Sequence, residues 1–544
     1  MLTVNNITKN FGLKKILNAV SFTVNGGDRT MILGANGSGK STLLKIVAGE
    51  EKPDTGTVRF NPTDLKWFYI PQVRSFDESQ TIGSIIQPHY FHEIEPELRL
   101  EQVSRLLSQD PQNPELIEEF DALLAAMQIH APDDSAVADA LQKLGLAGFS
   151  LDTPANQLSG GQKTRLYLAK AVLSGASLLL LDEPTNDLDE EMLEWLEDWF
   201  LQFSGGILYV SHDRAFLNRT ANHVLELDRD THSLKAYEGN YDSWTASKAA
   251  EQQSELAAWT RQQHSIRQLK DAVSQLESNA RFKKGGKGDS GDKFARGFFA
   301  NRTKGTMKRA VQLEDKLDKL ETADKLEKPG QHWKLKMEFS DTPETGEQVL
   351  VLDDLTVGYP GNILIDSIDL RLTRGNICVL TGKNGSGKSS LLKTITGAIQ
   401  PISGRVKLGS NVQIGTMTQG VDSPLFKENA YETLASLISQ NETEIRRLLS
   451  FYLFFGDDVF VPAANLSNGQ RARLTLACFA LTGVNLLLLD EPLNHLDIES
   501  RQQFEEVIES YPGTVLAVIH DRFFTERCAD KIWRIQDRKI VELA

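Results

Sequence analysis

Residues 30–42 read TMILGANGSGKST. MIL is an apolar run typical of a buried strand. The letters after it fit Gly-x-x-x-x-Gly-Lys-Ser, a loop whose backbone N–H groups surround a phosphate at the start of a helix. In this pattern Lys40 reaches the β- and γ-phosphates of a nucleotide, and Ser41 is a ligand of Mg²⁺. The stretch therefore predicts a strand, a phosphate-binding loop and a helix in an α/β fold.

Four motifs occur twice along the chain. The apolar run and the loop recur as ICVLTGKNGSGKSS at 377–390, where Lys388 and Ser389 replace Lys40 and Ser41. The other pairs are LSGGQ at 158–162 with LSNGQ at 466–470, LLLLDEP at 178–184 and 486–492, and VSHDR at 210–214 with VIHDR at 518–522. A chance glycine-rich turn would not repeat together with three further motifs. The sequence therefore contains two copies of one nucleotide-binding domain.

The spacing between the copies locates an insertion. Lys388 lies 348 residues after Lys40, whereas Asp490 lies 308 residues after Asp182, so the first copy contains about 40 additional residues. The flanking sequence places them near 88–132, where apolar spacing around DPQNP predicts two short helices and acidic side chains predominate. A helical hairpin packed on its own domain and an arm that binds a partner both fit this segment.

Length and composition limit the class of protein. A chain of 544 residues with 40% apolar and 24% charged residues is expected to form several globular domains. Its apolar runs are shorter than the roughly 18 residues that span a bilayer, and its first residues, MLTVNNITKNFG, lack an export signal. Three scattered cysteines form neither a disulfide framework nor a four-thiolate zinc site. The sequence therefore predicts a cytoplasmic protein.

Residues 245–330 differ from the repeated domains. Trp259, Ile266 and Val273 are seven residues apart, and three leucines between 313 and 320 continue a similar spacing. This spacing predicts two long helices packed antiparallel as a coiled coil, with glycines breaking the helix between them. The predicted domains are 1–244, a helical linker at 245–330, and 331–544.

The linker carries a basic segment in a chain whose net charge is −15. Residues 281–309 hold ten Lys and Arg, two Asp and four Phe. Basic side chains neutralise nucleic-acid phosphates, and phenylalanines stack on unpaired bases, so the segment favours an RNA partner. A solvated charged coil is the alternative, and the four phenylalanines argue against it.

The carboxylates needed for hydrolysis follow the two leucine runs. Asp182 and Asp490 end these runs at the carboxyl edge of a buried parallel strand, where a carboxylate can hold Mg²⁺ through water. The next residues, Glu183 and Glu491, are placed to orient or deprotonate the attacking water. A solvated strand end is the alternative, which the phosphate loop in the same repeat outweighs.

Two further pairs of polar residues follow apolar runs. His212 and His520 could contact the γ-phosphate, although a single histidine is more often structural. Gln72 and Gln419 could meet the metal and the water, although a glutamine alone has little specificity. The predicted metal ligands are Ser41, Gln72, Asp182, Ser389, Gln419 and Asp490.

These motifs together resemble the ATP-binding-cassette (ABC) ATPases, and the resemblance covers both halves of the chain. In that family two cassettes close head-to-tail over two ATP molecules. The resemblance implies that LSGGQ and LSNGQ each complete the opposite site: Ser159, Gly160 and Gly161 that of Lys388, and Ser467, Asn468 and Gly469 that of Lys40. It also implies that the aromatic rings of Phe11 and Tyr359 stack on adenine and that both sites hydrolyse ATP.

The predicted nucleotide-binding residues are distributed over both copies. In the first they are Phe11, Gly34, Asn36, Gly37, Gly39, Lys40, Ser41, Thr42, Gln72, Ser159, Gly160, Gly161 and Asp182. In the second they are Tyr359, Gly382, Asn384, Gly385, Gly387, Lys388, Ser389, Ser390, Gln419, Ser467, Gly469 and Asp490.

Within the ABC ATPases the chain resembles the ABC-F family. The linker, the insertion in the first copy only, and the strings EPTNDLD at 183–189, SHDRAFLNRTANHVLELD at 211–228 and YEGNYDSW at 237–244 carry this resemblance. It implies a monomeric chain whose ATP-closed cassettes bind the ribosomal E site. The linker then probes the P-site tRNA and the peptidyl-transferase centre, and the protein leaves after hydrolysis. Translation factors and antibiotic-resistance factors that protect the ribosome both belong to this family.

Two positions depart from the family pattern EPTNHLD, namely Asp187 in the first copy and Leu493 in the second. The acidic insertion favours contact with a ribosomal protein over contact with ribosomal RNA. The alternative function is the ATPase subunit of a membrane transporter, and the long basic linker argues against it.

Overall fold

The structure is a computed structural model. It describes residues 1–72, 76–77, 80–86, 100, 103–107, 113, 116–117, 120, 134–284, 308–309, 311–322, 324–326, 345–417, 425–494 and 496–543. The chain divides into two compact units, Met1–Tyr241 with Lys334–Ala544, and Asp242–Trp333. Below, the first cassette denotes the described residues up to Tyr241, and the second cassette those from 345 onward.

The main sheet of the first cassette has the strand order β5-β6-β7-β3-β8-β9. Its strands are β3 (Arg29–Leu33), β5 (Trp67–Ile70), β6 (Leu178–Asp182), β7 (Gly206–Val210), β8 (His223–Leu227) and β9 (Leu234–Glu238). All neighbours are parallel except β8 and β9. Every residue of β6 and β7 is buried, which explains the unbroken apolar letters of these strands.

A smaller antiparallel sheet and several helices surround this main sheet. The smaller sheet has the order β2-β1-β4 and consists of β1 (Leu2–Phe11), β2 (Lys14–Val24) and β4 (Thr55–Phe60). It shares one apolar core with α1 (Lys40–Val47) and the main sheet. The other helices are α2 (Ile82–Ile86), α5 (Asp134–Lys143), the 3₁₀ turn Ala155–Gln157, α6 (Gly160–Leu173), α7 (Glu190–Gln202) and α8 (Arg214–Thr220).

The second cassette repeats the sheets of the first. Its main sheet has the order β14-β15-β16-β12-β17-β18, and its smaller sheet the order β11-β10-β13. The strands are β10 (Gln348–Tyr359), β11 (Asn362–Thr373), β12 (Ile377–Gly382), β13 (Ser403–Leu408), β14 (Ile414–Met417), β15 (Leu486–Asp490), β16 (Thr514–Val518), β17 (Lys531–Gln536) and β18 (Lys539–Leu543).

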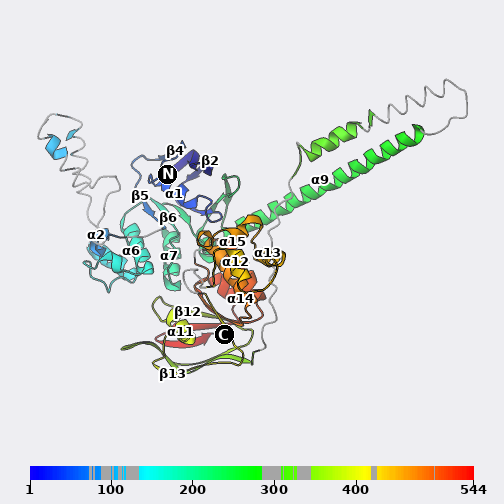
Figure 1. Cartoon of the computed structure of the whole chain (residues 1–544). Helices are drawn as coiled ribbons and strands as arrows, with labels where there is room; N and C mark the ends of the chain where they lie inside the picture. Colours follow the sequence, from blue (N-terminus) through cyan, green and yellow to red (C-terminus); the bar gives the residue numbers. More distant parts are fainter. Residues whose placement is uncertain are drawn as a thin grey trace, which may run out of the picture. The chain divides into compact units, whose positions relative to one another are not determined.

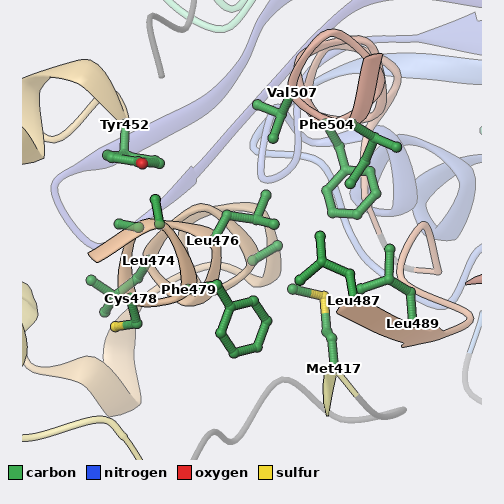
Figure 2. Close-up of a cluster of buried hydrophobic side chains, with 14 of the residues drawn as sticks. Met417, Tyr452, Leu474, Leu476, Cys478, Phe479, Leu487, Leu489, Phe504 and Val507 are labelled. Atoms are coloured by element: carbon green, nitrogen blue, oxygen red, sulfur yellow. The ribbon is translucent and has the colours of Figure 1, made fainter. Parts of the chain in front are cut away.

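The helices of the second cassette bury the largest apolar cluster described. They are α11 (Lys388–Ile395), α12 (Ala430–Ala435), α13 (Glu442–Phe451), α14 (Asn468–Leu481), α15 (Ile498–Ser510), α16 (Arg522–Cys528) and the 3₁₀ turns Gly456–Phe460 and Ala463–Asn465. Side chains of α14 and α15 pack on Leu487 and Leu489 of β15 (Figure 2). This packing holds both helices against the main sheet of the second cassette.

The linker begins with α9 (Tyr241–Lys284), one continuous helix of 44 residues (Figure 1). A second helical run covers 311–321. Lys270 Nζ lies 2.7 Å from Glu321 Oε1, and the backbone N–H of Leu326 donates to Gln262 Oε1 at 2.9 Å. Because earlier residues of α9 meet later residues of the second run, the two runs are antiparallel, as expected.

Several predictions lie largely outside the described residues. Of the insertion at 88–132, only 100, 103–107, 113, 116–117 and 120 are described. The same holds for most of the basic segment at 281–309, in which the side chains are described at 308 and 309 only, and for Gln419. The two predicted helices of the insertion and the coiled-coil character of the linker therefore stay predictions.

Candidate functional site

The phosphate loop of the first cassette lies between β3 and α1. Gly34 has a φ of +156°, and a Cβ atom there would lie 2.6 Å from the carbonyl oxygen of Leu227. Gly39 has a φ of +107°, and a Cβ atom there would lie 2.8 Å from Ile16 of the adjacent β-hairpin. Only glycine fits these two positions without displacing backbone or core, so the letters G-x-x-x-x-G are required by the loop itself.

Lys40 lies at the start of α1 and reaches back over the loop. It is 7% exposed, and its Nζ donates to the carbonyl oxygens of Gly34 at 2.7 Å and Ala35 at 3.1 Å. Lys388 makes the equivalent bonds to Gly382 at 2.7 Å and Lys383 at 3.0 Å. Both ammonium groups are therefore held inside a ring of backbone, where a phosphate group would sit at a helix N-terminus.

The two acidic residues of each copy lie at a strand end. Asp182 ends β6, and Glu183 follows with a φ of +53°, which turns its side chain out of the strand direction. Its Oε1 lies 3.0 Å from Nε2 of His212. In the second copy, Glu491 has a φ of +51° and its Oε1 lies 3.9 Å from Nε2 of His520. Repetition of a disfavoured conformation at both glutamates indicates that their orientation matters.

The second copy also joins the loop to its aspartate. Ser389 Oγ donates to Asp490 Oδ1 at 3.1 Å. Asn494 Nδ2 donates to Glu491 Oε2 at 2.6 Å. A serine hydroxyl beside a strand-end carboxylate is the donor set expected for Mg²⁺ that is also bound to nucleotide phosphates.

Burial sets the electrostatics of both sites. It lowers the pKa of Lys40, and the carboxylates of Glu183, Asp497 and Asp182 oppose this fall. Burial likewise lowers the pKa of Lys388. For His520, burial and the charge of Lys388 lower the pKa to about 4, so this imidazole is neutral at pH 7.

Two cavities have walls from both cassettes; Lys40, Ser41 and Asp182 line the first, whereas Lys388, Ser389 and Asp490 do not line the second. One, of about 380 Å³, is lined by Lys40, Asp182, Glu183 and His212 together with Asn468 of the second cassette. The other, of about 460 Å³, is lined by Glu491 and His520 together with residues 159–162 of the first cassette. The structure thus brings LSGGQ (158–162) and LSNGQ (466–470), below called the signature sequences, each to the site of the opposite cassette.

Local sequence explains where the signature helices begin. Ser159 and Gln162 form a capping box at the start of α6, and Ser467 and Gln470 form another at the start of α14. A Cβ atom on Gly161 would lie 2.5 Å from the carbonyl oxygen of Asp187, and one on Gly469 would lie 2.7 Å from Ser500 Oγ. The small residues therefore allow the signature to lie against the segment that follows the strand-end glutamate of its own cassette.

Other predicted residues fall around the same cavities. Gly37, Gly39, Ser41, Thr42, Gln72 and Asn36 line the cavity of Lys40, and Asn384 and Gly385 line the other. Gly382 and Gly387 have positive φ values in the second loop, and Ser390 lies on α11. Phe11 and Tyr359 end β1 and β10 and are about half exposed, at 50% and 47%. The roles of these residues remain predictions.

Sequence reasoning missed a set of contacts between the cassettes. The backbone N–H of Asn36 donates to Asp497 Oδ2 at 2.8 Å, and that of Asn384 donates to Asp189 Oδ2 at 3.3 Å. Arg214 pairs with Glu505, and Arg522 with Glu197. The sequence does contain an indication of these contacts, because each of these acidic and basic residues recurs 308 residues later, at the same offset as the repeated motifs.

The donor sets fit a nucleoside triphosphate and a divalent cation. Each site offers loop N–H groups, one buried lysine, one serine hydroxyl and one strand-end carboxylate. Among the described residues, no group of three His, Cys, Asp or Glu side chains could hold a metal by itself. Mg²⁺ is usually bound through one or two carboxylates together with substrate phosphates, and the strand-end aspartate of each site supplies one such carboxylate.

Comparison with protein families identifies the class. A family model described as ABC transporter matches residues 17–186 and 365–494, and another with the same description matches 227–339. No described helix, α9 included, carries an apolar stretch sufficient to cross a lipid bilayer. The chain is an ABC ATPase with two cassettes.

Individual relatives identify the family. YdiF of Bacillus subtilis is 36% identical over 100% of this chain and 81% of its own length. ABC transporter F family member 5 of Arabidopsis thaliana is 32% identical, over 98% of this chain and 74% of its own. The energy-dependent translational throttle protein EttA of Mycobacterium tuberculosis is 32% identical, over 97% and 90%. The chain belongs to the ABC-F family.

Solved structures with low identity share the fold. The archaeal ribosome recycling factor aABCE1, in complex with the stalk protein aP1, matches with a TM-score of 0.56 at 16% identity. That match covers 97% of this chain and 87% of the other. The structure titled RNase-L Inhibitor matches with a TM-score of 0.53 at 18% identity, with coverage of 97% and 87%. These matches support the twin-cassette fold.

Proposed function

We propose that this ATPase binds the ribosome near the E site when ATP closes its cassettes, and leaves when ATP is hydrolysed. Support comes from the relatives named energy-dependent translational throttle protein, which are 32% identical over nearly the whole chain. A ribosomal partner also explains why a chain of net charge −15 carries a basic linker with phenylalanines, because basic side chains bind RNA phosphates. The proposed location is the cytoplasm, where ribosomes work.

The observation that carries this proposal is the composition of the two cavities. Each combines a phosphate loop or catalytic residues of one cassette with the signature helix of the other. A triphosphate bound there contacts both cassettes at once, so its binding energy favours the closed arrangement. Loss of the γ-phosphate removes that link. ATP hydrolysis is therefore suited to time the release of a partner that binds the closed form.

We assign the chemistry to residues of both copies. Glu183 and Glu491 orient and deprotonate the attacking water, while His212 and His520 contact the γ-phosphate. The signature residues 159–161 and 467–469 complete the sites, and Phe11 and Tyr359 stack on adenine. Ser41, Asp182 and Gln72 would hold Mg²⁺ at one site, and Ser389, Asp490 and Gln419 at the other. The metal would supply positive charge at the β- and γ-phosphate oxygens.

The linker at 245–330, between cassettes at 1–244 and 331–544, is proposed to reach RNA. Its basic segment at 281–309 would contact the P-site tRNA or the peptidyl-transferase region, where counterion release and base stacking favour binding. The insertion at 88–132 would contact a ribosomal protein, because its acidic side chains repel RNA phosphates. The chain would act as a monomer, since its two cassettes already form both sites.

The test uses the paired variant E183Q/E491Q, which keeps the nucleotide sites but removes the proposed bases. With ATP this variant should cosediment with ribosomes, and without ATP it should remain in the supernatant. The variant K40A/K388A is the matched control, since it lacks the lysines that hold the phosphates and should not cosediment under either condition. Equal cosedimentation of E183Q/E491Q with and without ATP would overturn the proposal.

A second assay separates the two biological roles. Deletion of the basic segment 281–309 should abolish any protection that overexpression gives against antibiotics that bind the ribosome. A general translation factor should instead show altered growth or polysome profiles without a change in drug susceptibility. Copurification with an integral membrane complex in place of ribosomes would favour the transporter alternative.

A further inference from the structure

Helix α15 of the second cassette contacts the first ATP site at two points. Asp497 caps this helix, with its Oδ1 accepting from the backbone N–H of Ser500 and its Oδ2 accepting from Asn36 in the phosphate loop. Two turns further along, Glu505 pairs with Arg214. Arg214 lies two residues after His212, at the start of α8. One helix of the second cassette therefore contacts two parts of the first: the phosphate loop, and the segment that carries His212. The segments that carry His212 and His520 are below called the histidine loops.

Helix α7 of the first cassette makes the corresponding contacts with the second site. Asp189 caps α7 and accepts from the backbone N–H of Asn384 in the second phosphate loop. Eight residues later, Glu197 pairs with Arg522, which lies two residues after His520. The spacing from capping aspartate to glutamate is the same in both helices, so the arrangement is reciprocal.

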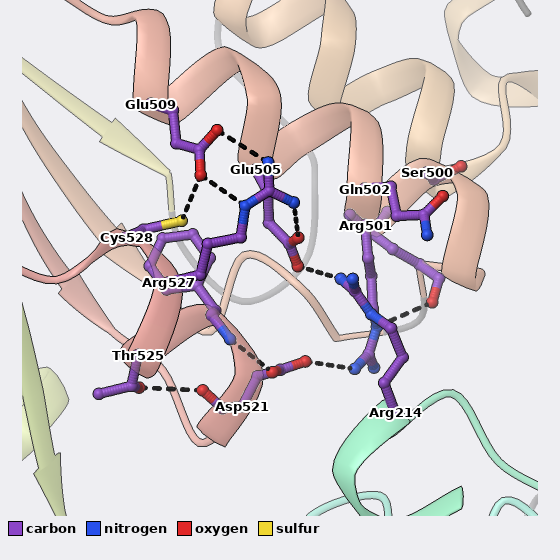
Figure 3. A network of polar contacts seen from close by, with 12 residues as sticks. Arg214, Ser500, Arg501, Gln502, Glu505, Glu509, Asp521, Thr525, Arg527 and Cys528 are labelled. Carbon is purple, nitrogen blue, oxygen red and sulfur yellow. Dashed lines mark hydrogen bonds and ion pairs between the residues drawn. The ribbon is translucent and has the colours of Figure 1, made fainter. Parts of the chain in front are cut away.

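The glutamates at these contacts are completely buried. Glu197 and Glu505 are both 0% exposed, and Arg214 is 2% exposed. Each glutamate has a further arginine from its own cassette. Arg219 pairs with Glu197, and Arg527 pairs with Glu505 (Figure 3). A buried carboxylate needs such partners to remain charged, because desolvation favours its neutral form. Each glutamate is thus held between the two cassettes.

Helix geometry makes this connection stiff. Eight residues of α-helix span about 12 Å, and the ends of that span cannot move independently without breaking backbone hydrogen bonds. Arg214 also lies over the ring of Phe523 on α16, with its Cζ 4.3 Å from the ring centre. Phe523 directly follows Arg522, which pairs with Glu197 beside the second site, so a shift of the histidine loop in the first cassette reaches the histidine loop of the second.

We propose that Arg214 with Glu505 and Arg522 with Glu197 are positioning pairs that couple the closure of the two ATP sites. None of these four residues lines either of the two cavities, so they act through His212 and His520. The inference rests on the proposed roles of these histidines and not on the ribosomal partner. Loss of nucleotide binding at one site should then impair turnover at the other, as long as the pairs are intact.

The test measures this coupling directly by ATP hydrolysis without ribosomes. K388A disables the second site. The factor by which K388A lowers ATP turnover, below called its cost, is measured in the native protein and in the quadruple variant R214M/E505L/R522M/E197L. Apolar replacements are chosen because a buried ion pair exchanged for apolar groups of similar size usually keeps the fold. Arg219 and Arg527 retain Asp198 and Glu509 as partners in this background.

In the native background K388A should reduce total turnover about tenfold or more, and in the pair-less background only about twofold. R534Q is the matched control, because Arg534 pairs with Glu190 between the same cassettes at 3.4 Å but on the surface. It should leave the tenfold cost unchanged. Equal costs of K388A in the native and pair-less backgrounds would overturn the proposal, whatever the ribosome assay gives.

A second measurement distinguishes coupling by these ion pairs from a purely structural role of the same pairs. If the pairs only held the cassettes together, the quadruple variant would lose thermal stability and the Michaelis constant for ATP would rise with coupling unchanged. If the quadruple variant fails to fold, R214M/E505L alone is used. It should lower the cost of K388A by a factor of at least two, and an unchanged cost would contradict the inference.

Discussion

The hydroxyl groups of Thr185 and Ser211 form a buried hydrogen bond of 2.8 Å, and Thr185 lies two residues after Glu183. At the same positions of the second cassette lie Leu493 and Ile519, both buried in one apolar cluster. The departure of Leu493 from the family pattern is therefore matched by a second change, which exchanges a polar pair for an apolar pair. A hydrogen bond in the first cassette, and a shared apolar cluster in the second, thus connects the segments that carry the glutamate and the histidine.

The first prediction follows from this exchange. L493T places a hydroxyl in the apolar cluster that also contains Ile519 and removes apolar volume, so it should destabilise the protein by about 2–4 kcal/mol. L493T/I519S restores a hydroxyl partner and should recover about 1 kcal/mol of that loss. Thermal unfolding of the full chain measures both effects. The reverse exchange, T185L/S211I, should lower thermal stability less than T185L alone. An equal loss of stability in both variants would contradict the idea that these two residues changed as a pair.

The second prediction concerns the two glutamates. E183Q/E491Q should lower ATP turnover about 10²–10⁴-fold, because the amide cannot accept the proton of the attacking water. ATP affinity should change little, since Lys40 and Lys388 keep their contacts. Phosphate release and nucleotide binding are measured on the same preparation. E238Q, at an exposed glutamate, is the control and should retain full turnover.

The third prediction is a pH dependence that arises between the cassettes. Burial and the charge of Asp521 raise the pKa of Asp213 to about 6, while a backbone N–H and the charges of Arg501 and Arg522 oppose the rise. A carboxyl whose pKa is higher in the closed interface than in solvent binds its proton preferentially when closed. The ionised carboxylate of Asp213 therefore opposes closure of the cassettes fully above pH 6. This opposition weakens as the pH falls below 6 and the carboxyl group is protonated.

ATP affinity of E183Q/E491Q should thus gain about fourfold from Asp213 when the pH falls from about 7.5 to 5.5. D213N keeps an acceptor for the helix cap and removes the titration. The ratio of affinities between the two variants cancels the titration of ATP itself. A pH profile that is identical with and without D213N would exclude this carboxyl as the source.

The fourth prediction concerns Asp187, the other departure from the family pattern. Its Oδ2 would lie 3.3 Å from a Cβ on Gly160, at the positive end of α6 and in the wall of the cavity with Glu491. A carboxylate there competes with a phosphate for the same helix terminus. In a K40A background, where the Lys388 site is the one measured, D187N should tighten ATP binding about two- to fivefold.

Calorimetric titration of K40A and K40A/D187N measures this difference. D187E retains the charge and should not tighten binding. The gain from D187N should also shrink at high salt, because the aspartate is exposed and its field is screened. Unchanged affinity at low salt would show that Asp187 does not oppose the phosphate.

The sequence predicted the parts of the site that are encoded by local geometry. A phosphate loop has one backbone path, so the letters around Lys40 and Lys388 locate the lysine, the serine and the helix start. The leucine runs likewise locate Asp182 and Asp490 at strand ends, because unbroken apolar letters require a strand buried on both faces. Which signature faces which loop came from the family resemblance, and the cavities agree with that assignment.

Contacts between the cassettes could not be predicted in the same way. Arg214 and Glu505 are 291 residues apart and belong to different copies, and nothing in the local sequence of either names the other. The left-handed backbone of Glu183 also has no sequence signature, since glutamate rarely adopts it. The sequence signal for these contacts is weaker: Glu197 on α7 recurs as Glu505 on α15 at the 308-residue offset, which marks the position without naming its partner.

The reciprocity of the contacts made by α7 and α15 has a consequence for assembly. Surfaces related by an approximate two-fold axis can join two separate molecules as readily as two parts of one, so a cassette could pair with its complement on another chain. Covalent connection favours the internal pairing by holding the complement at a local concentration of about a millimolar. A chain cut within the linker would be expected to lose this advantage, and its two fragments would then associate in a concentration-dependent manner.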